Sequence, residues 1–358
     1  MSQFKGENIS LSVFGQSHSE AIGVVIEGLP SGITINEDNI KAFMKRRAPS
    51  ASAFSTQRKE EDSPVFVSGV LNGKTTGAAV CAVIFYKDQR SKDYSALFYT
   101  PRPGHADYTA RVKYKGLEDT RGGGAFSGRM TAPLCIAGAI AKDFLAEKGI
   151  TIGSHILSVA DISEERFDAV NITAEELNSV TAKPFGTVSD EKGQQMLEKI
   201  AEARDNCDSL GGVIECAAVG VPVGFGGELF DGVESELARL AFAVPAVKGF
   251  EIGSGFEASR LCGSVNNDPY YYDEFGNVKT ETNNHGGILG GLTSGMPLIF
   301  RAAIKPTPSI AKTQKTVNLQ TKENTELVIG GRHDSCIVPR ALPVLESCLA
   351  ITLLDKLI

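Results

Sequence analysis

The chain has 358 residues, of which 42% are hydrophobic and 22% charged, and its net charge at pH 7 is −7. This length and apolar content allow a large core in one domain or two, whereas the acidic balance argues against a general nucleic-acid binder, whose surface is basic. Seven widely spaced cysteines without a C-x-x-C pair argue against a disulfide framework or a metal site and favour a reducing cytoplasm. Because the first residues are polar and no apolar run reaches about 20 residues, we expect neither a signal peptide nor a membrane segment.

The first 150 residues predict four strands and two helices. Strands are predicted by alternating or β-branched apolar residues over 9–13, 23–27, 64–71 and 78–86. Asn36 is the predicted N-cap of a helix over 37–47, and the Asn72–Gly73 pair predicts a hairpin turn. A long apolar helix is predicted over 128–148 and should end at Gly149.

The second half of the chain predicts similar elements. Strands are predicted over 150–160, 212–219, 246–252 and 298–304, with a short one over 326–328. Helices are predicted over 190–206 after an N-cap at Ser189, over 233–242 and over 340–357. Residues 264–284 are rich in Asn, Asp and Tyr, which indicates an excursion or a weak hairpin.

The segment 101–129 has the composition of a ligand-binding loop. It holds His105, Asp107, six glycines and, among its arginines, Arg102, Arg121 and Arg129. Glycine lets a backbone approach a ligand closely, arginine suits phosphate and carboxylate, and histidine transfers protons near pH 7. We therefore predict that this segment forms the floor of an anion-binding catalytic site.

The five histidines fall into different settings. His18, His105 and His333 lie in polar loops beside glycine or aspartate, where a chemical role is favoured. His155 lies within a predicted strand and is expected to be structural. His285 is either a turn residue or a ligand contact.

Two later loops extend the predicted site. In Gly330–Asp334, the aspartate could orient a histidine or a cofactor edge, or cap the turn. Lys305-Pro-Thr-Pro-Ser309 offers a lysine and two hydroxyls on a stiff backbone, which suits a phosphate and sugar-like hydroxyls. The chain has no P-loop, no glycine motif of the Rossmann type opening a helix and no G-x-S-x-G motif.

Four sequence blocks occur twice in the same order. The pairs lie at 28–32 and 220–224, 69–77 and 287–295, 101–103 and 306–308, and 128–129 and 331–332. The repetition predicts an α+β fold, a β-α-β sandwich with long helices between two mainly antiparallel sheets and a pseudo-twofold internal repeat. The single domain would cover 1–358, with related halves of roughly 1–150 and 211–358.

Nine motifs together resemble the chorismate synthase family, and the match covers essentially the whole chain. They are Phe14-Gly-Gln-Ser-His18, Lys45-Arg-Arg-Ala-Pro49, Thr56-Gln-Arg-Lys-Glu60, Arg102-Pro-Gly-His-Ala-Asp-Tyr108, Arg121-Gly-Gly-Gly124, Ala246-Val-Lys-Gly-Phe-Glu-Ile-Gly253, Gly286-Gly-Ile-Leu-Gly-Gly291, Lys305-Pro-Thr-Pro-Ser309 and Gly331-Arg-His-Asp334.

The resemblance implies a cytoplasmic lyase of the shikimate pathway. Its reaction would be the 1,4-anti elimination of phosphate and a C6 proton from 5-enolpyruvylshikimate 3-phosphate, giving chorismate. The resemblance associates the chain with flavin and nicotinamide nucleotides (FMN, FAD and NADP) and implies reduced FMN (FMNH2) as cofactor, with NADPH only as a possible external reductant. It also implies a small anionic substrate, a homotetramer and an external flavin reductase, with no nucleic-acid or membrane partner.

The resemblance also assigns roles to residues. His105 would protonate the reduced flavin near N1, His18 would protonate the departing phosphate, and Asp334 would assist proton removal through flavin N5. Flavin contacts would fall on Ala125, Phe126, Ser127, Pro245, Ala246, Gly290, Lys305, Pro306, Thr307, Pro308, Ser309 and Arg332. The substrate or NADP would contact Arg47, Arg102 and Arg129. The chain departs from the usual family pattern at Gln16, Ser19, Ser50, Ala53, Ala125 and Met130.

Two other interpretations remain open from the sequence. A flavin oxidoreductase could use the same pocket, and a non-catalytic anion-binding or RNA-binding paralogue would explain the arginines replaced by Ala53 and Ala125.

Overall fold

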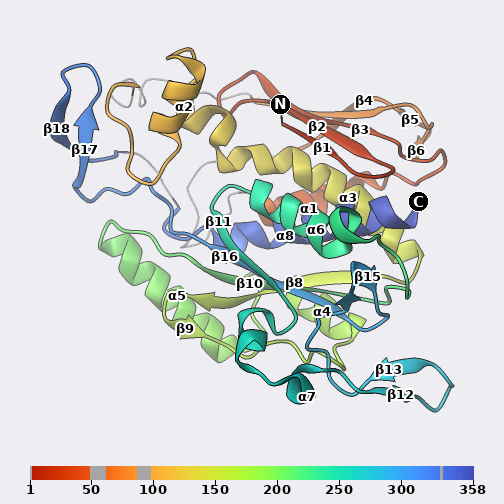
Figure 1. The fold of residues 1–358 in the computed structure, drawn as a ribbon. Helices are drawn as coiled ribbons and strands as arrows, with labels where there is room; N and C mark the ends of the chain where they lie inside the picture. The colour runs from red at the N-terminus through yellow and green to blue at the C-terminus, as the bar shows by residue number, and fades with distance from the viewer. Residues whose placement is uncertain (1, 49–61, 87–97, 331–333) are drawn as a thin grey trace.

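The computed structural model describes residues 2–48, 62–86, 98–330 and 334–358, and two antiparallel sheets dominate it (Figure 1). The first sheet has the order β1 (Gln3–Lys5), β2 (Ser10–Gly15), β3 (Ala21–Glu27), β7 (Val80–Phe85) and β4 (Val65–Ser68). The second has the order β11 (Val247–Ile252), β16 (Leu298–Ile304), β10 (Gly212–Val219), β8 (Thr151–Val159) and β9 (Ile162–Ser163).

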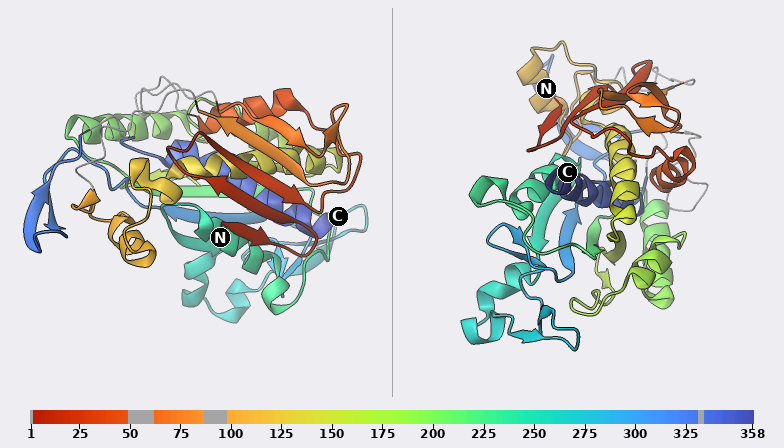
Figure 2. Two further views of the ribbon diagram at one scale, coloured as in Figure 1. Left: turned by 90° about the horizontal axis from the view of Figure 1, so that it is seen from above. Right: turned by 90° about the vertical axis from the view of Figure 1, so that its right-hand side faces the viewer.

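The layer between the sheets holds α1 (Glu37–Arg47), α3 (Thr131–Glu147), α6 (Val233–Ala243) and α8 (Val338–Leu357) (Figures 1 and 2). Helix α3 contacts β3 and β7, α8 contacts β8 and β10, and the two helices pack against each other. Gly138 of α3 lies directly against Ser347 of α8, so the helices approach closely. Because α3 and α8 are apolar around most of their circumference, burial between two sheets removes them from water.

The remaining elements lie outside this layer. They are α2 (Asp107–Tyr114), α4 (Ala174–Thr181), α5 (Asp190–Asp205), α7 (Gly263–Asn266) and the hairpins β5–β6 (Val70–Leu71, Lys74–Thr75), β12–β13 (Tyr270–Tyr272, Val278–Thr280), β14–β15 (Ile288–Leu289, Leu292–Thr293) and β17–β18 (Gln314–Asn318, Glu323–Leu327). Helices α4 and α5 both contact β8. No helix in the described ranges has the length and apolar character that crossing a membrane requires.

The mixed helix-and-sheet class predicted from the sequence is confirmed. Asn36 caps α1 by accepting a hydrogen bond from the backbone N–H of Asn39 (3.1 Å), and Ser189 caps α5. The turn at Asn72–Gly73 joins β5 to β6, as its sequence predicts. Three short helices, α2, α4 and α7, were not predicted, although α4 begins with a capping box between Thr173 and Glu176.

Candidate active site

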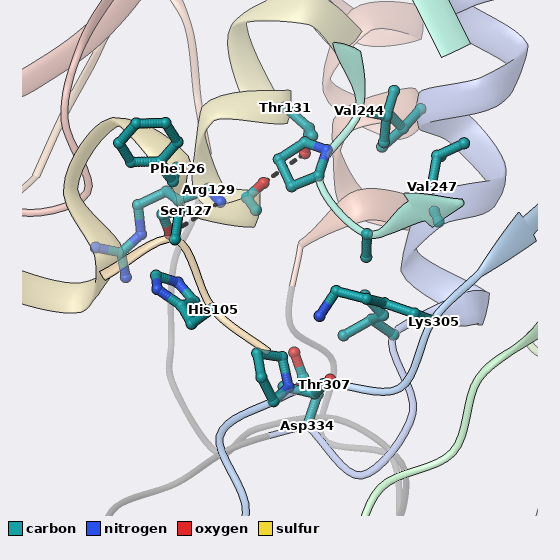
Figure 3. A pocket seen from close by; sticks show the side chains of 18 of the residues that line it. His105, Phe126, Ser127, Arg129, Thr131, Val244, Val247, Lys305, Thr307 and Asp334 are labelled. Atoms are coloured by element: carbon teal, nitrogen blue, oxygen red, sulfur yellow. Dashed lines mark hydrogen bonds between the residues drawn. The ribbon is translucent and has the colours of Figure 1, made fainter. Parts of the chain in front are cut away.

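A cavity of about 660 Å³ lies between the start of α3 and the start of α8. Six of its lining side chains are basic and one is acidic: Arg47, Arg102, Arg129, Lys248, Lys305 and Arg340, and Asp334. Figure 3 shows His105 and Arg129 on one side of the cavity, Lys305 on the other, and Thr307 and Asp334 between them. The volume is typical of small-molecule sites, and the excess of positive charge favours an anion.

His105 is held by an ionic cluster at the cavity wall. Its Nδ1 lies 2.5 Å from Oδ1 of Asp107. Arg102 donates to the same carboxylate from Nε and Nη2, both at 2.7 Å, and from its backbone N–H at 3.0 Å. Burial alone would raise the pKa of Asp107, but hydrogen bonds from Arg102 and His105 outweigh it and hold that pKa below its ordinary value. The ionised carboxylate orients the imidazole with its Nδ1–H toward Asp107, and Nη2 of Arg102 lies 3.1 Å from Nδ1 and 3.4 Å from Nε2.

Arg102 is committed to this cluster. Its side chain is 5% exposed, and its Nη1 also donates to Oγ of Ser309 (3.2 Å). It therefore joins the 102–107 segment to the loop after β16. From its position behind His105, it contributes positive charge to the cavity.

The three consecutive glycines after Arg121 separate the two predicted catalytic histidines. All three have positive φ, at 58°, 89° and 53°, which side chains rarely adopt. A Cβ at Gly122 would lie 2.5 Å from Nδ1 of His18, and one at Gly123 would lie 3.0 Å from Nε2 of His105. His18 is 5% exposed, and it lies behind Gly122 rather than among the residues that line the cavity.

Two other predicted residues lie in ion pairs at the cavity. Arg47 is 2% exposed and pairs with Asp62, whose charge raises the pKa of the guanidinium against the lowering effect of its burial. Asp334 pairs with Arg340 of α8 at 2.5 Å, and Nε of Arg340 donates to the backbone oxygen of Arg47 (2.9 Å). Both basic side chains are thereby held in place at one side of the cavity.

Arg129 is anchored at the start of α3. Its Nη1 donates to the backbone oxygen of Ser17 at 2.5 Å, and its guanidinium lies 4.8 Å from the ring centre of Tyr86. The hydroxyl of Ser127 accepts from the Arg129 backbone N–H (3.3 Å) and caps this turn. The Ser17 contact links Arg129 to the segment that holds His18.

Most of the residues predicted to bind a cofactor do line the cavity: Ala125, Phe126, Ser127, Pro245, Ala246, Lys305, Thr307, Pro308 and Ser309. Gly290 lies instead in the turn of the β14–β15 hairpin, and Pro306 is not among the residues that line the cavity. Arg332 and His333 lie outside the described residues.

Two features of this wall suit a polar ligand. The buried Oγ1 of Thr307 has no hydrogen-bond partner among the described residues, so a ligand or water must satisfy it. Ala246 has a φ of 77°, a strained conformation that is found most often at binding sites. Lys305 donates to the Gly104 oxygen (3.0 Å), and burial, followed by the charge of Lys248, lowers its pKa.

The structure brings to the site several residues for which the sequence interpretation named no individual role. Asp107, Asp62 and Arg340 orient the predicted residues through ion pairs, and Lys248 lines the cavity. The sequence His105-Ala-Asp107 was a usable signal, because it places a carboxylate two residues from a histidine in the same loop. No sequence pattern connects Arg47 to Asp62.

The fold and the cavity are typical of an enzyme. A histidine–carboxylate pair faces a cationic pocket that suits a small anion. The family model "Chorismate synthase" matches residues 9–358. The chain therefore belongs to the chorismate synthase family, whose members are lyases.

Individual relatives agree over the full length. The chain is 44% identical to the chorismate synthase of Methanocaldococcus jannaschii (99% of this chain, 95% of that protein). It is 46% identical to that of Thermococcus gammatolerans (99% and 97%) and 45% identical to that of Dehalococcoides mccartyi strain 195 (99% and 96%). A crystal structure of a chorismate synthase superposes with a TM-score of 0.77 at 28% identity, covering 98% of this chain and 92% of that one.

Proposed function

We propose that the cavity binds 5-enolpyruvylshikimate 3-phosphate with reduced FMN and catalyses the 1,4-anti elimination that gives chorismate and phosphate, the last common step of the shikimate pathway. In this reaction the C6–H bond breaks, as does the bond between the ring carbon and the phosphate oxygen. A second double bond forms in the ring, and no net oxidation occurs. The observation that supports it most is the His105–Asp107–Arg102 cluster facing a cavity with six basic side chains. Such a cavity suits a substrate with two carboxylates and a phosphate.

The proposed roles follow from what each side chain touches. His105, held by Asp107 through Nδ1, would present a proton on Nε2 at the cavity wall. Asp334 would assist removal of the C6 proton through flavin N5, and His18 would supply a proton to the departing phosphate. When bound, reduced FMN supplies an electron transiently and accepts the C6 proton.

Substrate anions would be bound by Arg47, Arg102 and Arg129. The described residues proposed to hold FMN are Ala125, Phe126, Ser127, Pro245, Ala246, Lys305, Pro306, Thr307, Pro308 and Ser309. Gly290 and Arg332 belong to this set on the family resemblance alone. NADPH is proposed only as an external reductant that acts through a separate flavin reductase, and a cytoplasmic homotetramer is proposed on the same basis.

We also propose that residues 1–358 form one domain, a β-α-β sandwich of two related halves. The two G-x-P-x-G turns make the same hydrogen bonds. Thr75 Oγ1 accepts from the Ile33 N–H (3.0 Å) and donates to the Pro30 oxygen (2.6 Å). Thr293 Oγ1 accepts from the Phe225 N–H (3.0 Å) and donates to the Pro222 oxygen (2.6 Å).

Strand order supports the same proposal. The first sheet contains the run β2-β3-β7-β4, and the second contains β8-β10-β16-β11, in which β8 (Thr151–Val159) lies outside the predicted second half 211–358. In each run the third strand follows the fourth in the chain, and a long helix, α3 or α8, ends the half.

The direct test is an anaerobic assay of the purified protein with 5-enolpyruvylshikimate 3-phosphate and dithionite-reduced FMN. We expect chorismate and phosphate in equal amounts, and none of either with oxidised FMN. NADPH oxidation without phosphate release would favour a flavin oxidoreductase instead. Tight substrate binding without turnover would favour a non-catalytic paralogue.

A further inference from the structure

A second cavity of about 220 Å³ lies on the other side of His105. His105, Ala106, Ala125 and Phe126 line both cavities, so this thin wall separates the two spaces. The second cavity extends between α2 and residues 117–120, away from the cationic pocket. No role for it follows from the proposed elimination itself.

Glu118 is the unusual side chain of this cavity. It is 7% exposed, and neither carboxylate oxygen has a hydrogen-bond partner among the described residues. Arg111 lies 3.6 Å away and so favours its charge, but that guanidinium donates to the Phe98 oxygen (2.8 Å) and stacks over the Phe98 ring. The Glu118 carboxylate can therefore accept hydrogen bonds from molecules in the cavity.

A buried carboxylate without partners is costly unless water reaches it. At about 30 Å³ for each water molecule, a space of this volume holds several. The other polar wall residues, among them Gln16, Asp107 and Thr120, provide further partners for such water. The cavity is thus suited to a short chain of water between Glu118 and His105.

We propose that Glu118 is a proton-relay residue that exchanges protons between solvent and His105 through water in the second cavity. The step is a proton transfer alone: the O–H bond of the Glu118 carboxylic acid breaks, an N–H bond forms on the imidazole, and the carboxylate retains the electron pair. The exchanged proton resides on Nε2, because Nδ1 donates to Asp107. The proposal rests on the proposed function only in treating His105 as a residue that must recover its proton.

The relay is needed when cofactor and substrate fill the main cavity. Bound cofactor and substrate exclude water from the cationic side, which leaves His105 without solvent there. The charged groups around His105 are Arg102 and Asp107 in its own segment, Arg129, Lys305 and Asp334 in the main cavity, and Glu118 and Asp119 in the second. Of those in the second cavity, Asp119 is bound by Arg121 at 2.7 and 2.9 Å, so Glu118 is the carboxylate available for exchange.

The test measures exchange of the His105 ring N–H protons with water by NMR saturation transfer, in protein whose main cavity is filled with oxidised FMN and 5-enolpyruvylshikimate 3-phosphate, which do not react. The signals are assigned by their loss in His105→Ala. We expect Glu118→Gln to slow exchange at least tenfold, Glu118→Asp to retain it within threefold, and Asp119→Asn to leave it unchanged within twofold. Slowing below threefold in Glu118→Gln, or equal slowing in Asp119→Asn, would overturn the proposal.

A second variant covers the case in which Glu118→Gln destabilises the protein. Ala110→Leu places an apolar side chain in the second cavity without altering Glu118. It should slow exchange at least tenfold, and an unchanged rate would exclude the water path. Because oxidised FMN supports no turnover, the exchange rates are measured independently of the chorismate assay, so the two proposals fail separately.

Discussion

Oδ1 of Asp107 lies 2.5 Å from Nδ1 of His105, and the same carboxylate binds Arg102 through two side-chain nitrogens at 2.7 Å. The contact depends on local geometry: Gly104 turns the chain with a φ of 73°, and α2 begins at Asp107. The carboxylate therefore serves as the orienting partner of the imidazole and as the counterion of a buried arginine.

Replacing Asp107 with asparagine should lower chorismate turnover by about 10²–10⁴-fold, because the amide no longer selects the tautomer with a proton on Nδ1. The measurement is anaerobic turnover with reduced FMN. If Asp107 acts through His105, then Asp107→Asn should cause little further loss in a His105→Ala background. If the losses of turnover caused by the two single variants multiplied in the double variant, that role would be contradicted.

Gly122→Ala should displace the His18 ring, since the added Cβ would lie 2.5 Å from its Nδ1 and the residue has a φ of 58°. We expect about a 10²-fold loss of turnover, the scale associated with a misplacement of about 1 Å at a reacting group. Gly276→Ala is the matched control, because Gly276 also has a positive φ (80°) and a Cβ there meets nothing within 4 Å. Equal turnover in both variants would remove His18 from the chemistry.

Local sequence patterns predicted those elements that local interactions determine. The cap at Asn36 and the boundaries of β10 (Gly212–Val219) and β16 (Leu298–Ile304) follow from capping and from β-branched runs, and the structure confirms them. Helix α2 was missed because its eight residues bury only Ala110, so no apolar periodicity marks it.

The partners of the site residues could not be predicted, because they depend on contacts far apart in the chain. Arg47 meets Asp62 only because the first sheet returns beside α1. Arg46 pairs with Glu346, 300 residues later. The motif residues at the cavity were predicted together, whereas the position of His18 behind Gly122 depends on a glycine backbone that no pattern of residue types describes.

Glu346 should contribute strongly to the free energy of unfolding, and this contribution should be lost in acid. It is fully buried and binds Arg46, Lys142 and Ser154. Burial alone would raise its pKa, but the charges of Arg46 and Lys142 outweigh it and lower the pKa to about 2 from 4.5. A lowered carboxyl pKa stabilises the fold above pH 4.5, and this stabilisation is lost as the pH falls toward 2.

Glu346→Gln should therefore cost about 3–5 kcal/mol at pH 7, because two cations remain buried without their anion. Urea unfolding at pH 7 and at pH 3 measures the difference between wild type and variant. The difference should shrink at the lower pH. A constant difference would assign the effect to packing rather than charge.

Glu236 should produce a pH dependence of the opposite sign. Burial, followed by the charge of Asp355, raises its pKa from 4.5 to about 7. A carboxyl pKa raised by folding contributes stability below pH 4.5 that is lost as the pH rises through about 7. Between pH 5 and 8 the thermal midpoint of the wild type should therefore fall relative to that of Glu236→Gln. Parallel midpoints across this range would contradict the shift.

The matched threonines Thr75 and Thr293 allow the two halves to be compared energetically. Each is nearly buried, at 4% and 2% exposure, and each hydroxyl bridges a backbone N–H and a backbone oxygen of its G-x-P-x-G turn. Replacement by valine keeps the shape but leaves both backbone groups without their partner, at a cost of about 1–3 kcal/mol. We expect Thr75→Val and Thr293→Val to lower the free energy of unfolding by similar amounts in urea titrations, and the corresponding serine variants to retain most of it. If one valine variant unfolds like the wild type while the other loses stability, the two turns are not equivalent, and the support that they give to an internal duplication is lost.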